Sequence, residues 1–203
     1  FEVEQAERNV VQRLSDGEHQ GTPVACLQAI LEDLTPKERE LVRHSLFLGV
    51  AKNSFQLSSS GAAEDPAFLV RNLIGVDPRT GSVAVGERLR VGQRVQFQLR
   101  DADASRQEQR QLLSQQRRRQ PEPLAALLFA CLGRGEGLYG QPDGDVRACR
   151  EHFAAVPVAG AFCNGEIGPV AGATHLHGYT ASWGFLVPNT TGANSTTPQH
   201  DAS

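Results

Sequence analysis

Residues 124–135 read LAALLFACLGRG, an unbroken apolar run that ends in two glycines and an arginine. A short apolar run bounded by turn residues is typical of a strand in the interior of a sheet. We therefore expect Leu124–Cys131 to form a buried central strand, with Leu127 and Phe129 inside the protein.

A second stretch repeats this design about thirty residues later. Residues 162–169 read FCNGEIGP and place an amide and a carboxylate among glycines after another apolar run. Polar groups on loops that follow rigid strands are a common way to present side chains to a small molecule. The two stretches together predict a ligand site.

The rest of the chain alternates between helical and extended patterns. Thr22-Pro23 and Thr35-Pro36 are N-cap and first-turn pairs, and they predict one helix to Leu34 and a short second helix. A polar helix is expected from Asp101 or Asp103 to about Gln116, and a short one at Asp145–Phe153. Strands are expected at Ser45–Ala51, Phe68–Val76, Ser82–Val85, Arg94–Arg100, Val156–Gly160, Ala161–Ile167, Thr174–Tyr179 and Ser182–Val187. Short connections favour antiparallel pairing, so the fold class is α+β, with mainly antiparallel, mixed sheets flanked by helices.

The composition argues against a nucleic-acid-binding or membrane-spanning protein. With 203 residues, 39% apolar content and a net charge of -3, the chain can bury a core but has no general attraction for nucleic acid. Its longest clean apolar run, Leu124–Leu132, is too short for a membrane span. No signal peptide is expected at the start of the sequence, and the lack of any methionine predicts a fragment. Four cysteines without metal-ligand spacing predict reduced thiols in the cytoplasm. We expect a folded domain over 1–188 and a disordered polar tail over 189–203.

Four further blocks accompany the two stretches: AERNVV at 6–11, HSLFLG at 44–49, FLVRNLIGVDPR at 68–79 and LHGYT at 176–180. With these blocks the sequence from Phe1 to Pro188 resembles the C-terminal half of the FIST family, sensory modules of bacterial signalling proteins and of one kind of eukaryotic F-box protein. The resemblance implies an intracellular signal-transduction domain that binds a small polar metabolite, with amino acids as one candidate class. It also implies a downstream signalling protein or domain as partner, and an N-terminal half of the module that is absent here.

The candidate ligand-binding residues follow from the two stretches. Cys131, Arg134, Asn164 and Glu166 are expected to converge on one concavity, and Asn164 and Glu166 share a face if the strand stays extended. The resemblance suggests that Arg134 holds a carboxylate and Glu166 an amine; the alternative is a structural Arg134–Glu166 ion pair. The full predicted set is Cys131, Gly133, Arg134, Gly135, Tyr139, Asn164, Glu166 and Arg71. Arg71 either lines the pocket or faces solvent.

No metal and no cofactor are expected. His175 and His177 have ligand spacing but lack a nearby third ligand, and the glycine pattern of residues 135–140 does not open a helix that could bind a dinucleotide. We expect no catalysis. Two alternatives remain open: a cysteine-dependent hydrolase, in which Cys131 would need a nearby histidine, and a protein-interaction scaffold like the F-box relatives.

Overall fold

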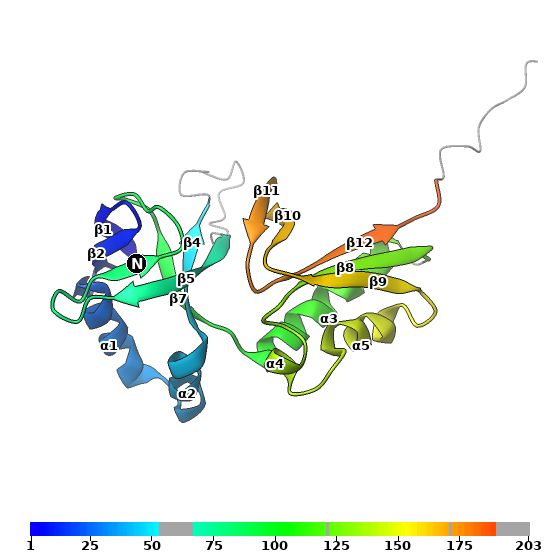
Figure 1. The fold of residues 1–203 in the computed structure, drawn as a ribbon, viewed down its shortest axis with the longest axis horizontal. Coiled ribbons are helices and arrows are strands. Elements are labelled where there is room, and N and C mark those ends of the chain that lie inside the picture. Colours follow the sequence, from blue (N-terminus) through cyan, green and yellow to red (C-terminus); the bar gives the residue numbers. More distant parts are fainter. Residues whose placement is uncertain (53–66, 121, 171, 190–203) are drawn as a thin grey trace, which may run out of the picture.

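The computed structural model describes residues 1–52, 67–120, 122–170 and 172–189, and it forms two lobes that lie side by side (Figure 1). Each lobe has its own hydrophobic cluster. The first is built from residues that include Val3, Leu14, Val50 and Val85, and the second from Leu113, Ala148, Cys149 and Phe153. The α+β fold class, with sheets that are mostly antiparallel, is confirmed.

The first lobe is an antiparallel sheet with the strand order β1-β2-β6-β5-β4-β7. Its strands are β1 (Glu2–Glu7), β2 (Val10–Ser15), β3 (Gln20–Gly21), β4 (Leu46–Ala51), β5 (Phe68–Val76), β6 (Val83–Val85) and β7 (Val95–Leu99), where β3 pairs with β2. The N–H of Val95 donates to the carbonyl of Phe1 at 2.8 Å, and the N–H of Val3 donates to that of Gln93 at 2.9 Å. The sheet therefore closes on itself where β1 meets the start of β7.

Two helices complete this lobe, α1 (Pro23–Asp33) and α2 (Pro36–Ser45). The hydroxyls of Thr22 and Thr35 accept hydrogen bonds from the backbone N–H groups of Ala25 and Glu38, so both are N-caps. The predicted helix starts are confirmed. The strands β1 and β2, by contrast, were not predicted from the sequence.

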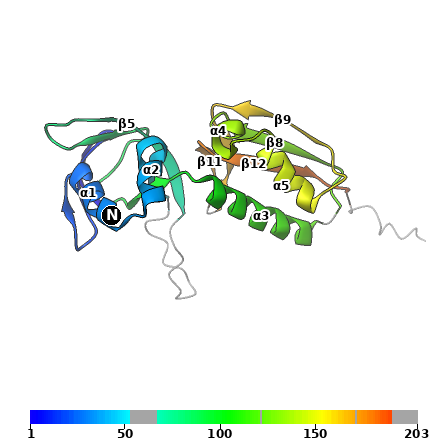
Figure 2. The same cartoon turned by 90° about the horizontal axis from the view of Figure 1, so that it is seen from below.

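The second lobe contains α3 (Ala102–Arg119), β8 (Ala125–Cys131), α4 (Glu136–Tyr139), α5 (Gly144–His152), β9 (Val158–Cys163), β10 (Glu166–Val170), β11 (Ala173–His177) and β12 (Ala181–Leu186). Its main sheet has the order β12-β8-β9, in which β8 pairs antiparallel with β12 and parallel with β9. The hairpin β10-β11 forms a separate two-stranded sheet. Figure 2 shows α3 and α5 together on one face of the main sheet.

Strand β8 is central in its sheet, but the prediction that it is buried on both faces is wrong. Ala126 and Leu128 face the helices and are 1% and 8% exposed, whereas Leu127 and Phe129 point to the other face and are 38% and 44% exposed. The reason is that successive side chains alternate across a sheet, and both packing helices lie on the same side. The opposite face, carried by Leu127 and Phe129, is called the open face below.

Two other elements differ from the sequence prediction. The strand expected over Ala161–Ile167 is interrupted, because the chain turns at Asn164-Gly165 between β9 and β10. The helix α3 continues beyond Gln116 to Arg119, where basic side chains suit the negative end of the helix dipole. The predicted disordered tail lies outside the described residues apart from Asn189. No helix in the described ranges is long and apolar enough to cross a membrane.

Candidate functional site

A cavity of about 380 Å³ lies in the second lobe, between the parallel pair β8–β9 and the start of α5. Its floor and walls come from three segments that are distant in the sequence. The lining residues are Leu128 and Ala130 of β8; Gly135, Glu136 and the stretch 142–146 before and within α5; and the stretch 158–162 of β9. A volume of this size suits a small metabolite.

The chain conformation around the cavity depends on three special positions. Gly135 and Asp143 have positive φ angles of 65° and 61°, which let the chain turn sharply before α4 and again before α5. Gly160 lies so close to β8 that an added Cβ would come within 1.8 Å of the carbonyl oxygen of Leu128. The cavity therefore lies where the turns at Gly135 and Asp143 meet the close contact of Gly160 with β8.

The polar groups of the cavity have two opposite characters. No side chain among the described residues caps the N-terminus of α5, so the N–H groups of its first turn are without intrahelical acceptors and form a partially positive end. Glu136 and Asp143, both exposed, bring carboxylates to the same cavity. The cavity thus has an apolar floor, with the partially positive N-terminus of α5 and two carboxylates around it.

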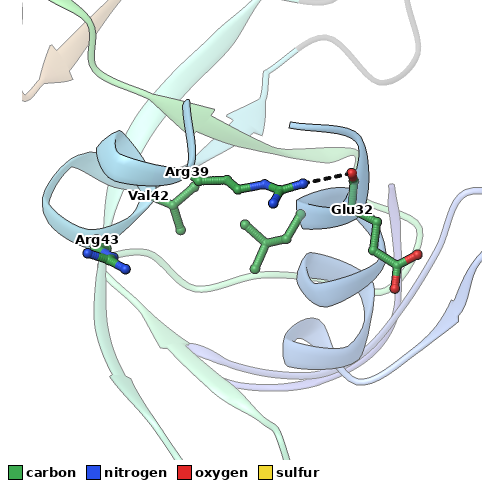
Figure 3. Close-up of a pocket in the computed structure, with 5 residues that line it drawn as sticks. Glu32, Arg39, Val42 and Arg43 are labelled. Atoms are coloured by element: carbon green, nitrogen blue, oxygen red, sulfur yellow. Dashed lines mark hydrogen bonds between the residues drawn. The ribbon is translucent and has the colours of Figure 1, made fainter. Parts of the chain in front are cut away.

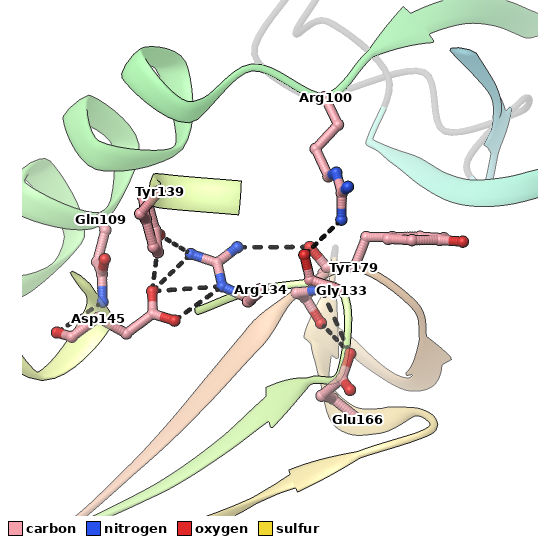
Figure 4. A network of polar contacts seen from close by, with 9 residues as sticks. Arg100, Gln109, Gly133, Arg134, Tyr139, Asp145, Glu166 and Tyr179 are labelled. Carbon is pink, nitrogen blue, oxygen red and sulfur yellow. Dashed lines mark hydrogen bonds and ion pairs between the residues drawn. The ribbon is translucent and has the colours of Figure 1, made fainter. Parts of the chain in front are cut away.

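Asp145, which lines the cavity, forms a buried ion pair with Arg134 behind it (Figure 4). The residues Arg134 and Asp145 are 9% and 5% exposed. Nη2 of Arg134 lies 2.7 Å from Oδ1 of Asp145. The hydroxyl of Tyr139 donates to the same oxygen at 2.8 Å and also accepts from Arg134. Because Arg134 neutralises it, Asp145 can sit in the first turn of α5 without opposing an anion there.

The pKa values of this network follow from burial and from the charges. Burial alone would lower the pKa of Arg134, but the hydrogen bonds and charge of Asp145 raise it above its ordinary value. Burial raises the pKa of the Tyr139 phenol strongly, against the opposing effect of Arg134. Both groups therefore keep their protons at neutral pH.

Helix α3 and the first lobe hold this network in place. Gln109 donates to the backbone carbonyl of Asp145 at 3.2 Å, and Arg106 donates to that of Tyr139 at 2.9 Å. Arg100, just after β7, donates to the carbonyl of Gly133 at 2.7 Å (Figure 4). The glycine-rich loop is thus tied both to α3 and to the junction between the lobes.

The predicted site residues separate into two groups. Gly135 lines the cavity, and the buried residues Arg134 and Tyr139 lie directly behind it in the same network. Cys131, the last residue of β8, and Gly133 in the loop that follows do not line the cavity. Asn164 is exposed at the turn after β9 and is also outside the lining. The expected convergence of Cys131, Arg134, Asn164 and Glu166 on one concavity is not found at this cavity.

Glu166 occupies a buried position of its own at 1% exposure. Its Oε2 accepts hydrogen bonds from the backbone N–H and the hydroxyl of Thr180, at 3.3 and 3.0 Å, while Oε1 has no protein donor within the described residues. Arg134 pairs with Asp145, so the alternative Arg134–Glu166 ion pair named the wrong partner. The reason is the turn at Asn164-Gly165, which directs Glu166 toward Thr180. Its role in binding an amine stays a prediction.

Arg71 lies in β5 of the first lobe, away from the cavity, and is partly buried. Its Nε is 2.6 Å from Oε2 of Glu87, and Lys52 pairs with the other carboxylate oxygen. Burial opposes the charged form of Glu87, but the hydrogen bonds from Lys52 and Arg71 hold its pKa below the usual range. Lys52, Arg71 and Glu87 therefore form a small network of ion pairs with a structural role.

Glu87→Gln should lower the free energy of unfolding of the first lobe by about 1.5–3 kcal/mol at neutral pH, the range for hydrogen bonds to charged groups. Since the pKa of Glu87 is depressed in the folded state, its contribution is present above its unfolded pKa of about 4.3 and is lost as the pH falls through the folded value. Urea unfolding followed by circular dichroism at several pH values would measure this. A difference between parent and variant that persists unchanged at pH 3 would contradict the prediction.

The cavity-lining residues outside the predicted set include Asp143, Asp145, Glu136 and Phe162, although Phe162 lies within one of the two stretches that predicted the site. Asp145 was expected only as a helix start, although a buried arginine such as Arg134 requires a carboxylate nearby. The available signal was the segment Pro142-Asp143-Gly144-Asp145, which combines a turn with an acidic first helical turn. Which carboxylate would pair with Arg134 depended on the path of the chain after Gly140.

A second hollow of similar volume lies between α1 and α2 and is lined by Leu31, Glu32, Arg39, Val42 and Arg43 (Figure 3). Arg39 donates to the backbone carbonyl of Glu32 at 3.0 Å, and Arg43 pairs with Glu40. Its cations are thus already engaged by the protein. The described residues also contain no cluster of three or more side chains suited to a metal ion. The β8–β9 cavity remains the better candidate.

Comparison with known proteins gives one family and several relatives. The profile of the FIST C domain family matches residues 24–169. Uncharacterized protein Mb0898c of Mycobacterium bovis is 40% identical over 166 residues, and uncharacterized protein MT0656 of Mycobacterium tuberculosis is 39% identical over the same length. Each match covers 81% of this chain and 42% of the relative, so the chain spans less than half the length of the curated relatives it matches. The cavity loop, α5 and β9 all fall inside the family match, and the chain belongs to the FIST C domain family.

Proposed function

We propose that the domain is a sensory module that reversibly binds a free amino acid with an apolar side chain in the β8–β9 cavity. The observation that carries the proposal is the cavity itself, in which an uncapped helix end and two carboxylates face an apolar floor. An amino acid carries one negative group, one positive group and a side chain. Each of these has a counterpart among the lining residues.

The carboxylate of the ligand would accept hydrogen bonds from the N–H groups of the first turn of α5. The ammonium group would pair with Asp143 or Glu136, and the apolar side chain would pack on Phe162 and Leu128. The anchoring role predicted for Arg134 passes in this proposal to the helix end. Arg134 acts indirectly, because it neutralises Asp145 beside the bound carboxylate.

Occupancy of the cavity has a physical route to the rest of the molecule. Gly135 lines the cavity, and two residues earlier the carbonyl of Gly133 accepts from Arg100 at the lobe junction. The ring of Tyr179 lies under the guanidinium of Arg100 and 4.3 Å from the ring of Phe47 in β4. A ligand that binds one arrangement of this loop more tightly than another would shift the contact between the lobes. A downstream signalling protein or domain would respond to that shift.

Binding of apolar amino acids should be weakened by Asp143→Asn and by Phe162→Ala. Asparagine tolerates the positive φ angle of position 143, so the first change removes the charge with little backbone cost. The loss of one charge-assisted hydrogen bond, about 1.5–3 kcal/mol, corresponds to roughly a tenfold to hundredfold rise in the dissociation constant. Isothermal titration calorimetry, after a thermal-shift screen of the twenty amino acids, would give these values.

Phe129→Ala is the matched control for Phe162→Ala. Phe129 is also partly exposed, but it lies on the open face and lines no part of the cavity. Its loss should leave the affinity within about twofold, since it contributes no contact to the ligand. The proposal is wrong if no amino acid raises the melting temperature, or if the control weakens binding as much as Phe162→Ala.

A second candidate function, a protein-interaction scaffold, is favoured by the open face, on which Leu127 and Phe129 are partly exposed. Catalysis is not part of the proposal. A nucleophilic Cys131 would need a general base and access to a substrate, but its residue is buried, with 8% exposed.

A further inference from the structure

Two of the four cysteines occupy neighbouring positions of one sheet. Cys131 is the last residue of β8 and Cys163 is the last residue of β9, and the two are direct partners in the parallel ladder. The N–H of Leu132 donates to the carbonyl of Cys163 at 3.0 Å, so the two strands are still hydrogen-bonded at this point. The sheet therefore holds side by side two cysteines that are distant in the sequence.

Both cysteine side chains lie on the same face of the sheet. Successive side chains alternate across a strand, so Cys131 points to the same side as Phe129, two residues before it. Cys163 is paired with Cys131, as Ala161 is with Phe129, and its side chain points to this side too. The two thiols are therefore neighbours at one end of the open face.

The backbone spacing of the two cysteines suits a disulfide bond. Neighbouring strands are about 4.8 Å apart, which is within the range of about 4.4–6.8 Å for the Cα atoms of bonded cysteines. The Cβ atoms must come to about 3.8 Å from each other, so the strand ends have to approach slightly. The register of the β8–β9 pair ends at these residues, and turns that contain Gly133 and Gly165 follow. The chain can therefore make this adjustment at the end of the ladder.

The other two cysteines are placed differently. Cys26 lies in the core of the first lobe, and Cys149 is completely buried among the core residues on the helix side of the second-lobe sheet. Burial raises the pKa of both thiols and so disfavours the reactive thiolate form. Of the four cysteines, Cys163 is the one that is partly exposed. A dissolved oxidant therefore reaches Cys163 first, and Cys131 is the thiol beside it.

We propose that Cys131 and Cys163 are an oxidation site that forms a reversible disulfide bond with hydrogen peroxide as the oxidant. The thiolate of Cys163 attacks one peroxide oxygen, the O–O bond breaks, hydroxide leaves, and Cys163 becomes a sulfenic acid. The thiolate of Cys131 attacks the sulfur of Cys163, the S–O bond breaks, and a second hydroxide leaves. The protons of the two thiols convert both hydroxides to water. Two thiols and one peroxide thus give one disulfide and two waters.

The disulfide would join two walls of the β8–β9 cavity. Phe162 lies directly before Cys163 and lines the cavity, as does Gly135 in the loop after Cys131. A Cβ added to Gly135 would be 3.1 Å from the ring of Phe162, so these two walls are in close contact. A covalent bond beside them would restrain that contact. The formation of the bond does not depend on the proposed amino-acid ligand, because oxidation is measured on the protein alone.

Mass spectrometry of the unmodified chain tests the oxidation site. Reduced protein that is freed of reductant and treated with hydrogen peroxide should lose the mass of two hydrogens and keep two of its four thiols. Trypsin should then release the peptides 120–134 and 151–203 joined by the disulfide, since Cys131, Cys149 and Cys163 lie in different tryptic peptides. Dithiothreitol should restore all four thiols by thiol–disulfide exchange.

Single variants separate the roles of the two thiols. Cys163→Ser should abolish the disulfide, whereas Cys131→Ser should leave a sulfenic acid at Cys163 that dimedone labels, because the resolving thiol is absent. Cys26→Ala is the matched control, since Cys26 lies in the other lobe, and this variant should form the disulfide as the parent does. A link between Cys163 residues of two chains, a link that forms only in urea, or the absence of any link between the two peptides would overturn the proposal.

Discussion

Asp145→Asn is expected to lower the free energy of unfolding of the second lobe by about 3–5 kcal/mol, because it leaves the guanidinium of Arg134 buried without a counter-charge. Arginine keeps its proton under all conditions of folding, so the side chain cannot adapt by becoming neutral. Asparagine preserves the shape of Asp145 but supplies only a neutral acceptor. The effect is therefore electrostatic, not a loss of packing.

Urea unfolding followed by the fluorescence of Trp183 measures this change. Trp183 is the single tryptophan of the chain and packs against the core of the second lobe, so its signal reports that lobe. Glu151→Gln is the matched control, since Glu151 forms a two-bonded pair with Arg110 at 2.8 and 3.0 Å on the surface. The loss of an exposed pair should cost about 1 kcal/mol or less. Equal effects of the two variants would show that burial does not decide the strength of the Arg134–Asp145 pair.

A double variant tests whether the unpaired charge causes the destabilisation. Arg134→Met combined with Asp145→Leu removes both charges and should be less destabilising than Asp145→Asn alone, because neither partner is then left unpaired. If the double variant is the least stable of the set, the polar network around Tyr139 would contribute more than the ion pair itself.

Gly160→Ala should destabilise the second lobe by about 3 kcal/mol, at the upper end of the range for overpacking. The added methyl group would approach the backbone oxygen of Leu128 to 1.8 Å, and a backbone atom cannot move aside as a flexible side chain can. The strands β8 and β9 would separate, and the floor of the cavity would be distorted. Trp183 fluorescence during urea unfolding again gives the measurement.

Gly184→Ala is the control for this change. Gly184 is also a strand glycine that neighbours β8, but its added Cβ would lie 4.0 Å from the side chain of Leu127, which is an ordinary contact. Alanine there should change stability by less than about 1 kcal/mol. A Gly160→Ala protein as stable as the Gly184→Ala protein would show that the two strands can separate without cost.

Much of the fold followed from local patterns in the sequence. The helix starts at Thr22 and Thr35 are confirmed because an N-cap followed by proline depends only on neighbouring residues. The strand at Leu124–Cys131 also formed as expected, but its two-sided burial did not. An unbroken apolar run does not tell whether helices cover one face of a sheet or both, since that depends on the path of the chain elsewhere.

The candidate site was predicted less well than the fold. The glycine-rich loop around Gly135 does form part of the cavity, because glycines after a strand permit the sharp turn that exposes the backbone. The partner of Arg134 was not predictable from sequence separation, since Glu136 is nearer along the chain than Asp145, which forms the pair. The turn at Asn164-Gly165 was underestimated, and this error placed Asn164 and Glu166 on one face.

The closure of the first-lobe sheet also affects the order in which the chain folds. The contact between Phe1 and Val95 joins positions 94 residues apart, so the sheet of the first lobe cannot close until β7 is present. Contacts between distant positions are slow to form because of the entropy lost in closing the intervening loop. The segment from α3 to β9 makes its contacts over shorter separations, and its helices α3 and α5 pack against each other. We therefore expect the second lobe to refold first in a stopped-flow experiment, and the closing of the first-lobe sheet to set the slowest folding phase.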